Sequence, residues 1–264
     1  MKKVKIAKPF VAFMLLLIFV FYSGTPSVAE TGKNWYFIKR GNDTPSFPSD
    51  AEYLATHQCY FVDSSVKGQE EKILYLTFDA GYENGNIEKI LDILKEKRVK
   101  GAFFVLSNLI VKNTDLIIRM VNEGHIVANH TKNHKDLTKL SESEIEANLK
   151  ALECLYEEKT GLSMSKYFRF PEGRYNEDTV LLLEKLGYKT IFWSMAHADW
   201  DDNKQPNENI ATQKLLSCTH PGAVILLHPT SRTNVLILPE LIDEWQKEGY
   251  TFGTLDMLVE NMGR

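Results

Sequence analysis

Beyond residue 71, short apolar runs rich in β-branched and aromatic residues alternate with longer segments in which apolar residues recur every three or four positions. The first pattern is typical of buried strands and the second of amphipathic helices. The predicted strands cover residues 73–78, 102–106, 125–128, 166–170, 189–193, 223–228 and 250–252. The predicted helices cover residues 87–97, 114–123, 141–159, 177–186, 207–217 and 236–247, and a short helix ends at residue 260.

The regular alternation of these patterns indicates the fold class. Strands separated by helices of about 10–15 residues are typical of parallel βαβ units. We therefore expect residues 71–264 to form one α/β domain, a distorted or incomplete (β/α) barrel of about seven parallel strands. A doubly wound open sheet is the alternative.

The first 29 residues have the pattern of an export signal. Four lysines and no acid precede an apolar run at 10–22, and Ser27-Val28-Ala29 fits a small-residue cleavage site. We expect cleavage after Ala29 and a mature protein on the cell-wall side of the membrane; a retained anchor with transient membrane association is the alternative. Residues 30–70 are predicted to be an extended segment that packs on the main domain, with one short helix near residues 50–57.

Composition excludes several classes of protein. Hydrophobic residues make up 44% of the chain and charged residues 25%, as in an ordinary globular protein. The formal net charge of −4 argues against a nucleic-acid partner, which needs a basic face. The three cysteines lack C-x-x-C spacing, so we expect buried thiols rather than metal ligands. We expect a monomer.

Five residues capable of chemistry follow apolar runs. They are Asp79, His130, Arg169, Asp199 and His228. In a parallel barrel the C-terminal ends of the strands share one face, where enzymes of this fold place their sites. The sequence therefore predicts that these side chains surround one site.

His130 and His134 are four positions apart. If the segment turns helically after its strand, both imidazoles point to one side and suit two ligands of a zinc-like ion. Two histidines at this spacing also occur by chance in a solvated polar turn, which is the alternative.

Asp79 and His228 each have a structural alternative to catalysis. Asp79 could cap the helix that follows it, or act as a general base. A buried guanidinium at Arg169 needs a carboxylate partner, and Asp79 is the expected one. His228 could be a core histidine, but a pairing with Asp199 would raise its pKa and make it a general acid.

Two further residues suggest a ligand surface. Gly173 permits close approach of the backbone to a ligand, and a main-chain N–H there or near Tyr175 could bind an oxyanion. Trp200 is either a core residue or an apolar wall for a sugar ring.

Together these residues resemble the polysaccharide deacetylase family (carbohydrate esterase family 4, NodB homology domain) over about residues 71–262. The matching motifs are residues 77–81 for T-F-D-D-G, 130–134 for H-[ST]-x-x-H, 169–173 for R-x-x-P-x-G, 199–200 for D-W and 226–228 for L-x-H. The resemblance implies a divalent metal, zinc, and an amide-hydrolysing activity. The implied residues are Asp79, Arg169, Asp199 and His228 for catalysis, His130 and His134 for the metal, and Pro171, Gly173, Tyr175, Trp200 and Leu226 for the substrate.

One position departs from the family motif. Ala80 replaces the second aspartate, usually the third protein ligand of the metal, and a methyl group cannot coordinate a cation. Residues 34–40, 77–85 and 193–196 are similar to the δ-lactam-biosynthetic (PdaA-like) branch of spore-forming bacteria. That branch implies N-acetylmuramic acid of the peptidoglycan glycan strand as substrate, on the route to the muramic δ-lactam of spore cortex. The alternatives are a deacetylase of N-acetylglucosamine polymers and a metal-free glycan-binding protein without activity.

Overall fold

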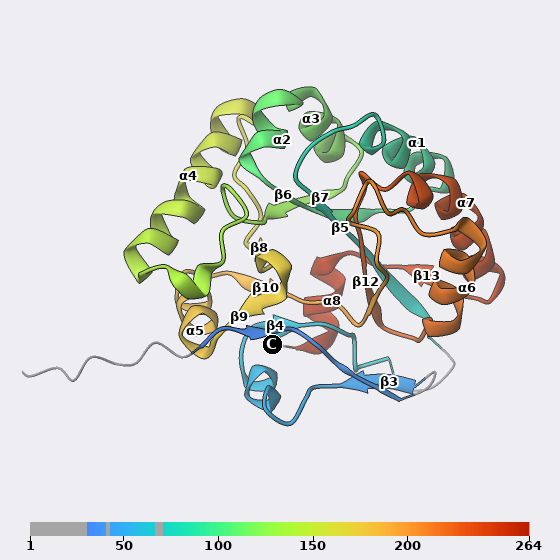
Figure 1. Ribbon diagram of the computed structural model, residues 1–264, viewed down its shortest axis with the longest axis horizontal. Coiled ribbons are helices and arrows are strands. Elements are labelled where there is room, and N and C mark those ends of the chain that lie inside the picture. Colours follow the sequence, from blue (N-terminus) through green and yellow to red (C-terminus); the bar gives the residue numbers. More distant parts are fainter. Residues whose placement is uncertain (1–30, 41–42, 67–70, 264) are drawn as a thin grey trace, which may run out of the picture.

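The computed structural model describes residues 31–40, 43–66 and 71–263 (Figure 1). Within these residues nine strands form one sheet in which every pairing between strands is parallel. The order is β11-β12-β5-β6-β7-β8-β10-β4, and β13 pairs with β5 outside this path. The bounds are β4 Cys59–Tyr60, β5 Ile73–Ala80, β6 Gly101–Val105, β7 Ile126–Asn129, β8 Tyr167–Phe168, β10 Lys189–Ile191, β11 Met195–Ala196, β12 Ala223–Leu227 and β13 Thr251–Phe252.

All helices except the last, α8, form an arc around the outside of this sheet, and α8 lies inside the arc (Figure 1). Their bounds are α1 Ile87–Lys97, α2 Ser107–Lys112, α3 Thr114–Asn122, α4 Glu142–Thr160, α5 Glu177–Lys185, α6 Glu208–Cys218, α7 Arg232–Lys247 and α8 Leu255–Met262. The largest apolar cluster lies between the sheet and these helices, and a second cluster fills the inner face of the sheet, where α8 contributes Leu255 and Leu258. Burial of both faces explains why the strands read as continuous apolar runs.

The order of the strands distinguishes between the two predicted folds. From β5 to β10 the strands follow one another in a single direction, and β12 returns to the free edge of β5. A doubly wound sheet reverses its direction in the middle, so the predicted incomplete barrel is confirmed. An isolated bridge between Val62 and Ala223 also draws the segment after β4 toward the start of β12.

The N-terminal segment is more closely integrated than an extended arm. A 3-10 helix, η1 (Glu52–Thr56), lies within the predicted range, and β4 adds a parallel strand to the main sheet beside β10. β1 (Lys33–Asn34) pairs with β9 (Arg174–Tyr175), while β2 (Ile38–Arg40) pairs with β3 (Asp43–Ser46). The predicted export signal at 1–29 lies outside the described residues. In the described part of the chain, each helix is too short or too polar to cross a membrane.

Several other sequence predictions differ from the structure. α2 was not predicted, because its six residues are too few to show a helical period. α7 begins four residues earlier than predicted, where the Ser231 hydroxyl accepts a hydrogen bond from the Asn234 N–H and caps the helix. The expectation of three buried thiols is confirmed for Cys59 and wrong for the other two, because Cys154 is exposed on α4 and Cys218 is half-buried.

Candidate active site

A cavity of about 680 Å³ lies at the C-terminal ends of β5, β11 and β12. A smaller cavity of about 280 Å³ adjoins it, because the two share lining residues. The shared residues are Asp79, His134, Trp200 and His228. Three of the polar residues predicted for the site therefore meet at one hollow, together with the exposed tryptophan.

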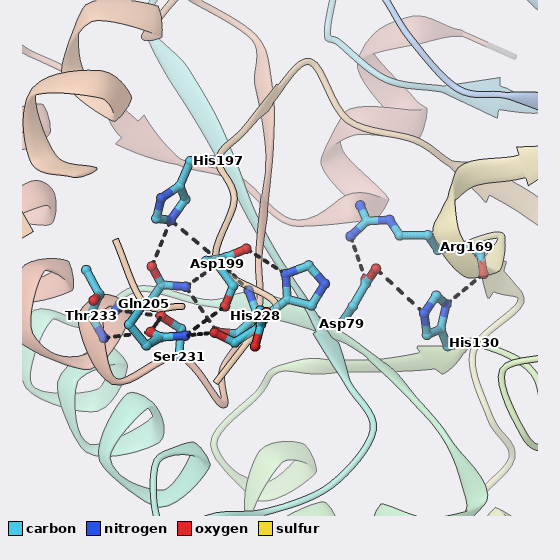
Figure 2. Close-up of polar contacts among 11 residues, drawn as sticks. Asp79, His130, Arg169, His197, Asp199, Gln205, His228, Ser231 and Thr233 are labelled. Carbon is cyan, nitrogen blue, oxygen red and sulfur yellow. Dashed lines mark hydrogen bonds and ion pairs between the residues drawn. The ribbon is translucent and has the colours of Figure 1, made fainter. Parts of the chain in front are cut away.

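Asp79 and Arg169 form a buried ion pair beside this cavity (Figure 2). Asp79 lies on the same face of β5 as Tyr75 and Thr77, because side chains alternate along a strand. The Arg169 guanidinium is fully buried, with Nη1 2.9 Å from Asp79 Oδ1 and Nε donating to the carbonyl of Ile191 at 3.0 Å. The predicted contact between Asp79 and Arg169 is present, and the N-cap of α1 is Asn86, so Asp79 does not cap that helix.

The surroundings of Asp79 keep its carboxylate ionised. Burial alone would raise the pKa of Asp79, but the positive charge of Arg169, with a contribution from His228, outweighs burial and lowers the pKa below its ordinary value. An ionised, oriented carboxylate at the edge of a cavity can accept a proton from a bound water.

His130 has a fixed tautomer. Its Nδ1–H donates to the main-chain carbonyl of Arg169 at 2.8 Å, which leaves the Nε2 lone pair 3.6 Å from Asp79 Oδ2 (Figure 2). Burial, opposed by the charge of Asp79 and reinforced by His134, lowers the pKa of His130 to about 4, so the ring is neutral near pH 7. A neutral imidazole held through one nitrogen by a carbonyl is the usual arrangement of a metal ligand.

His134 reaches the same place through an irregular loop. The predicted helical turn after β7 is wrong, because Thr131 (φ 74°) and His134 (φ 58°) adopt left-handed backbone conformations. The loop is held by hydrogen bonds from the Thr131 N–H to Asn129 Oδ1 at 2.8 Å and from the His134 N–H to Thr131 Oγ1 at 2.9 Å. The rings of His130 and His134 are nevertheless 5.0 Å apart between centroids, as two ligands of one ion require.

The donor set at this point fits a divalent cation through two imidazoles. Among the described residues no group of three His, Cys, Asp or Glu side chains is placed to hold a metal. Ala80 is fully buried in the outer core cluster and contributes no ligand atom. A cation held by His130 and His134 would have its other coordination positions left for water and substrate.

His228 and Asp199 form the other half of the site. The His228 Nδ1–H donates to Asp199 Oδ1 at 2.8 Å, and the His228 main-chain N–H donates to Oδ2 at 2.8 Å. Burial alone would lower the pKa of His228, but the hydrogen bond and charge of Asp199 outweigh it and raise the pKa above its ordinary value. The geometry thus supports a protonated imidazole that can donate its Nε2 proton.

Two residues of this half were not found from the sequence. Asn234 donates its amide to Asp199 Oδ2 at 2.5 Å, and His197 contacts Asn234 Oδ1 through Nε2 at 2.9 Å. Asn234 lies in the first turn of α7, which the predicted helix start omitted; the Ser231 cap was the signal that could have found it. His197 has no motif of its own, and only the fold brings it to Asn234.

The residues expected to contact substrate divide into two groups. Gly173, Trp200 and Leu226 line the larger cavity. Trp200 is 64% exposed, which rules out the core alternative. Gly173 has φ +63°, and a Cβ there would lie 2.8 Å from Trp193 Cη2, so only glycine fits this turn.

Pro171 and Tyr175 form the second group, because both are buried and line neither cavity. The Tyr175 ring packs in an aromatic cluster with Trp35 and Phe192. These two residues shape the turn that carries Gly173, and their side chains do not face the hollow.

Comparisons with known proteins agree with this geometry. A family model described as "Polysaccharide deacetylase" matches residues 66–191. Peptidoglycan-N-acetylmuramic acid deacetylase PdaA of Bacillus subtilis is 38% identical over 226 residues, covering 86% of this chain and 85% of that protein. The solved structure of Bacillus subtilis PdaA matches with a TM-score of 0.80 and 36% identity, covering 87% of this chain and 97% of that one.

Two further relatives bear on the alternatives. Peptidoglycan-N-acetylglucosamine deacetylase PgdA of Listeria monocytogenes is 33% identical over 208 residues, which cover 75% of this chain and 42% of that protein. A structure described as a CE4 family pseudoenzyme from Bacillus anthracis matches with a TM-score of 0.66 and 26% identity, covering 73% of this chain and 66% of that one. The chain thus belongs to the polysaccharide deacetylase family, carbohydrate esterase family 4, and is an amide hydrolase similar to PdaA.

Proposed function

We propose that this chain removes the acetyl group from N-acetylmuramic acid residues of peptidoglycan, on the route to the muramic δ-lactam of spore cortex. The observation that carries the proposal is the meeting at one cavity of Asp79, whose pKa is lowered, and His228, whose pKa is raised. The name of the 38% identical relative PdaA supports the choice of sugar. Export after removal of residues 1–29 would bring the enzyme to this substrate at the cell wall or in the forespore intermembrane space.

Substrate binding is assigned to the rim of the cavity. The exposed indole of Trp200 provides an apolar face for a sugar ring or an acetyl methyl group, and Leu226 lines the wall beside it. The turn at residues 171–175 brings the main chain close to the acetamide, and a main-chain N–H of this turn stabilises the negative charge that develops on the carbonyl oxygen.

The proposed reaction begins with proton removal from a water. Asp79 accepts this proton while Arg169 holds the carboxylate in place, and the oxygen attacks the acetamide carbon. His228, oriented by Asp199, then donates its Nε2 proton to the leaving nitrogen. The carbon–nitrogen bond breaks, and the products are acetate and a sugar with a free amine.

His130 and His134 are assigned to a divalent cation, zinc by its preference for imidazole. When bound, such an ion supplies positive charge that acidifies water and polarises the carbonyl. His130 is prepared for this role by the carbonyl of Arg169, which fixes the tautomer with Nε2 available.

The test is the product from purified peptidoglycan. Purified peptidoglycan would be incubated with the mature chain and then digested to muropeptides. Mass spectrometry of the muropeptides would locate the missing acetyl group. Loss of acetyl from muramic acid is expected. Loss only from glucosamine would replace the proposed substrate with that of PgdA, the second candidate, which is favoured by the 33% identical relative.

Ala80 motivates the remaining alternative, a glycan-binding protein without activity. Metal analysis of the purified chain beside an acetate assay separates the two. An enzyme is expected to contain the cation and release acetate, and to lose activity with a strong chelator. A binder would retain affinity for glycan with neither metal nor product.

A further inference from the structure

His197 lies next to Asp199 and His228, which we call the acid half of the site, and has no role in the reaction described above. It follows β11, lines the larger cavity, and its side chain is 5% exposed. Nε2 of the ring is 2.9 Å from Asn234 Oδ1 and 3.6 Å from Asp199 Oδ2 (Figure 2). A histidine so placed either fills space or fixes the hydrogen bonds around it.

The hydrogens of the Asn234 amide decide between these roles. Its Nδ2 group has two hydrogens, and these are directed to Asp199 Oδ2 at 2.5 Å and to the carbonyl of His228 at 3.0 Å. Oδ1 of Asn234 therefore faces His197 and can only accept, so His197 Nε2 carries the hydrogen. With the hydrogen of His197 on Nε2, the hydrogen-bonding atoms of Asn234, Asp199 and His197 are all paired correctly; with the hydrogen on Nδ1, two acceptors would face each other at Asn234 Oδ1.

The amide orientation matters because Asp199 is fully buried and forms several bonds. Oδ1 accepts from the His228 ring, and Oδ2 accepts from the His228 main chain and from Asn234. If the Asn234 amide turned over, its oxygen would face Oδ2 of Asp199. Two acceptors would then be in contact, and the carboxylate would lose its position against His228.

We propose that His197 is a positioning residue for the general acid: its Nε2–H holds the Asn234 amide in the one orientation that keeps Asp199 against His228. The proposal deepens the proposed function, because it rests on His228 as the proton donor. His197 acts through Asn234 and touches no reacting atom.

The charges around His228 determine how the loss of the hydrogen bond between His197 and Asn234 would change the pKa of His228. The titratable groups that face it or line the same cavity are Asp199, Asp79, Arg169, His134, Glu172 and His197 itself. Asp199 is the first of the groups that raise the pKa of His228, against the opposing effect of burial. Displacement of Asp199 therefore lowers the pKa of His228 and reduces the protonated fraction near neutral pH.

The experiment compares three substitutions at one position. His197→Gln places an amide N–H where Nε2 stood, whereas His197→Asn reaches only as far as Nδ1 and His197→Ala removes the donor. We expect His197→Ala and His197→Asn to lower kcat for acetate release about tenfold with unchanged KM, and His197→Gln to restore most of it. His57→Gln, which removes a histidine paired with Glu184 outside the cavity, is the matched control and is expected to leave kcat unchanged.

The pKa of His228, measured by NMR in the full mature chain without substrate, is the second readout. It should fall in the alanine and asparagine variants and return in the glutamine variant. Equal loss in all three variants, a change in KM alone, or an unchanged pKa of His228 would overturn the proposal. If His197→Ala does not fold, the glutamine and asparagine pair still decides. If the wild type releases no acetate, the proposed function fails while the NMR comparison still tests the positioning role.

Discussion

The two halves of the site are built from different physical interactions. Asp79, Arg169 and His130 are held at strand ends, and the centre of that half is one buried ion pair. Asp199 and His228 are held instead by a loop and the first turn of α7, where the Asp199 carboxylate accepts hydrogen bonds from the His228 ring, the His228 main chain and the Asn234 amide. Side-chain exposure is 0% for Arg169 and 24% for His228.

This difference indicates how each half tolerates change. Removal of one partner from a buried ion pair leaves an uncompensated charge, which costs about 3–5 kcal/mol of stability. Around Asp199 the support is divided among several hydrogen bonds, and removal of one between neutral side chains, such as that of His197 with Asn234, costs about 0.5–1.5 kcal/mol, so the effect is a shift of position and pKa. Substitutions in the base half (Asp79, Arg169 and His130) should therefore cause large losses of activity or stability. Substitutions in the acid half (Asp199 and His228) should mainly change the pH dependence of activity.

The largest expected effect is on activity in the base half. Asp79→Asn keeps an oxygen to accept the hydrogen bond from Arg169 but cannot take a proton, so acetate release should fall about 10²–10⁴-fold. Because the variant also leaves the Arg169 charge uncompensated, activity is measured at a temperature at which circular dichroism shows the variant to be folded. The comparison is with Asp243→Asn, which neutralises an exposed carboxylate paired with Lys97. Substantial activity in Asp79→Asn would remove this residue as the base.

The next effect is on stability. Arg169→Met leaves Asp79 buried without a partner and frees the carbonyl of Ile191, so the free energy of unfolding should fall by about 3–5 kcal/mol in urea denaturation. Lys247→Met is the control, because its ion pair with Glu244 is at the surface and should contribute only about 0–1 kcal/mol. Similar losses for both variants would contradict the distinction between the two halves.

In the acid half the expected effect is a shift in the pH profile. The folded pKa of His228 is raised above its ordinary value of 6.5, and in the proposed reaction the protonated ring is the active form. Activity should therefore decline as pH rises through that raised pKa, and so should the stability contributed by this group. Asp199→Asn should move the decline to lower pH. If the decline of activity at high pH stayed at the same pH in this variant, the decline would be due to the titration of another group.

Strand periodicity predicted the base half well, because its residues stand directly at the ends of apolar runs. The motif spacing also placed His130 near His134, although the loop between them is not helical. The acid half was predicted only as a pair, since Asn234 and His197 meet through tertiary contacts that no local pattern records. β4 was missed for the same reason: its two residues form a strand only because β10 lies beside them.

The smallest expected effect tests a link from the N-terminal segment to both halves. Trp35 donates its Nε1–H to the carbonyl of Trp193 at 2.9 Å, and its main-chain N–H donates to the carbonyl of Gly173 at 2.8 Å. Its ring stacks on Phe192, 4.2 Å between centroids, and the carbonyl of Phe192 accepts from Arg169. Trp35 thus supports the turn that carries Gly173 and lines the cavity. It also supports the segment after β10, which contacts Arg169 through Phe192 and continues toward Asp199.

Trp35→Phe retains an aromatic ring for stacking but loses the Nε1 hydrogen bond, so stability should fall by about 1 kcal/mol and KM should rise more than kcat falls. Tyr36→Phe is the control, because the Tyr36 side chain is exposed and its hydroxyl donates a hydrogen bond to Asp50 at the surface. Urea denaturation and steady-state acetate release measure both variants. If Trp35→Phe lowered stability without changing KM, the N-terminal segment would support the fold alone, and the two halves of the site would be positioned by the barrel without it.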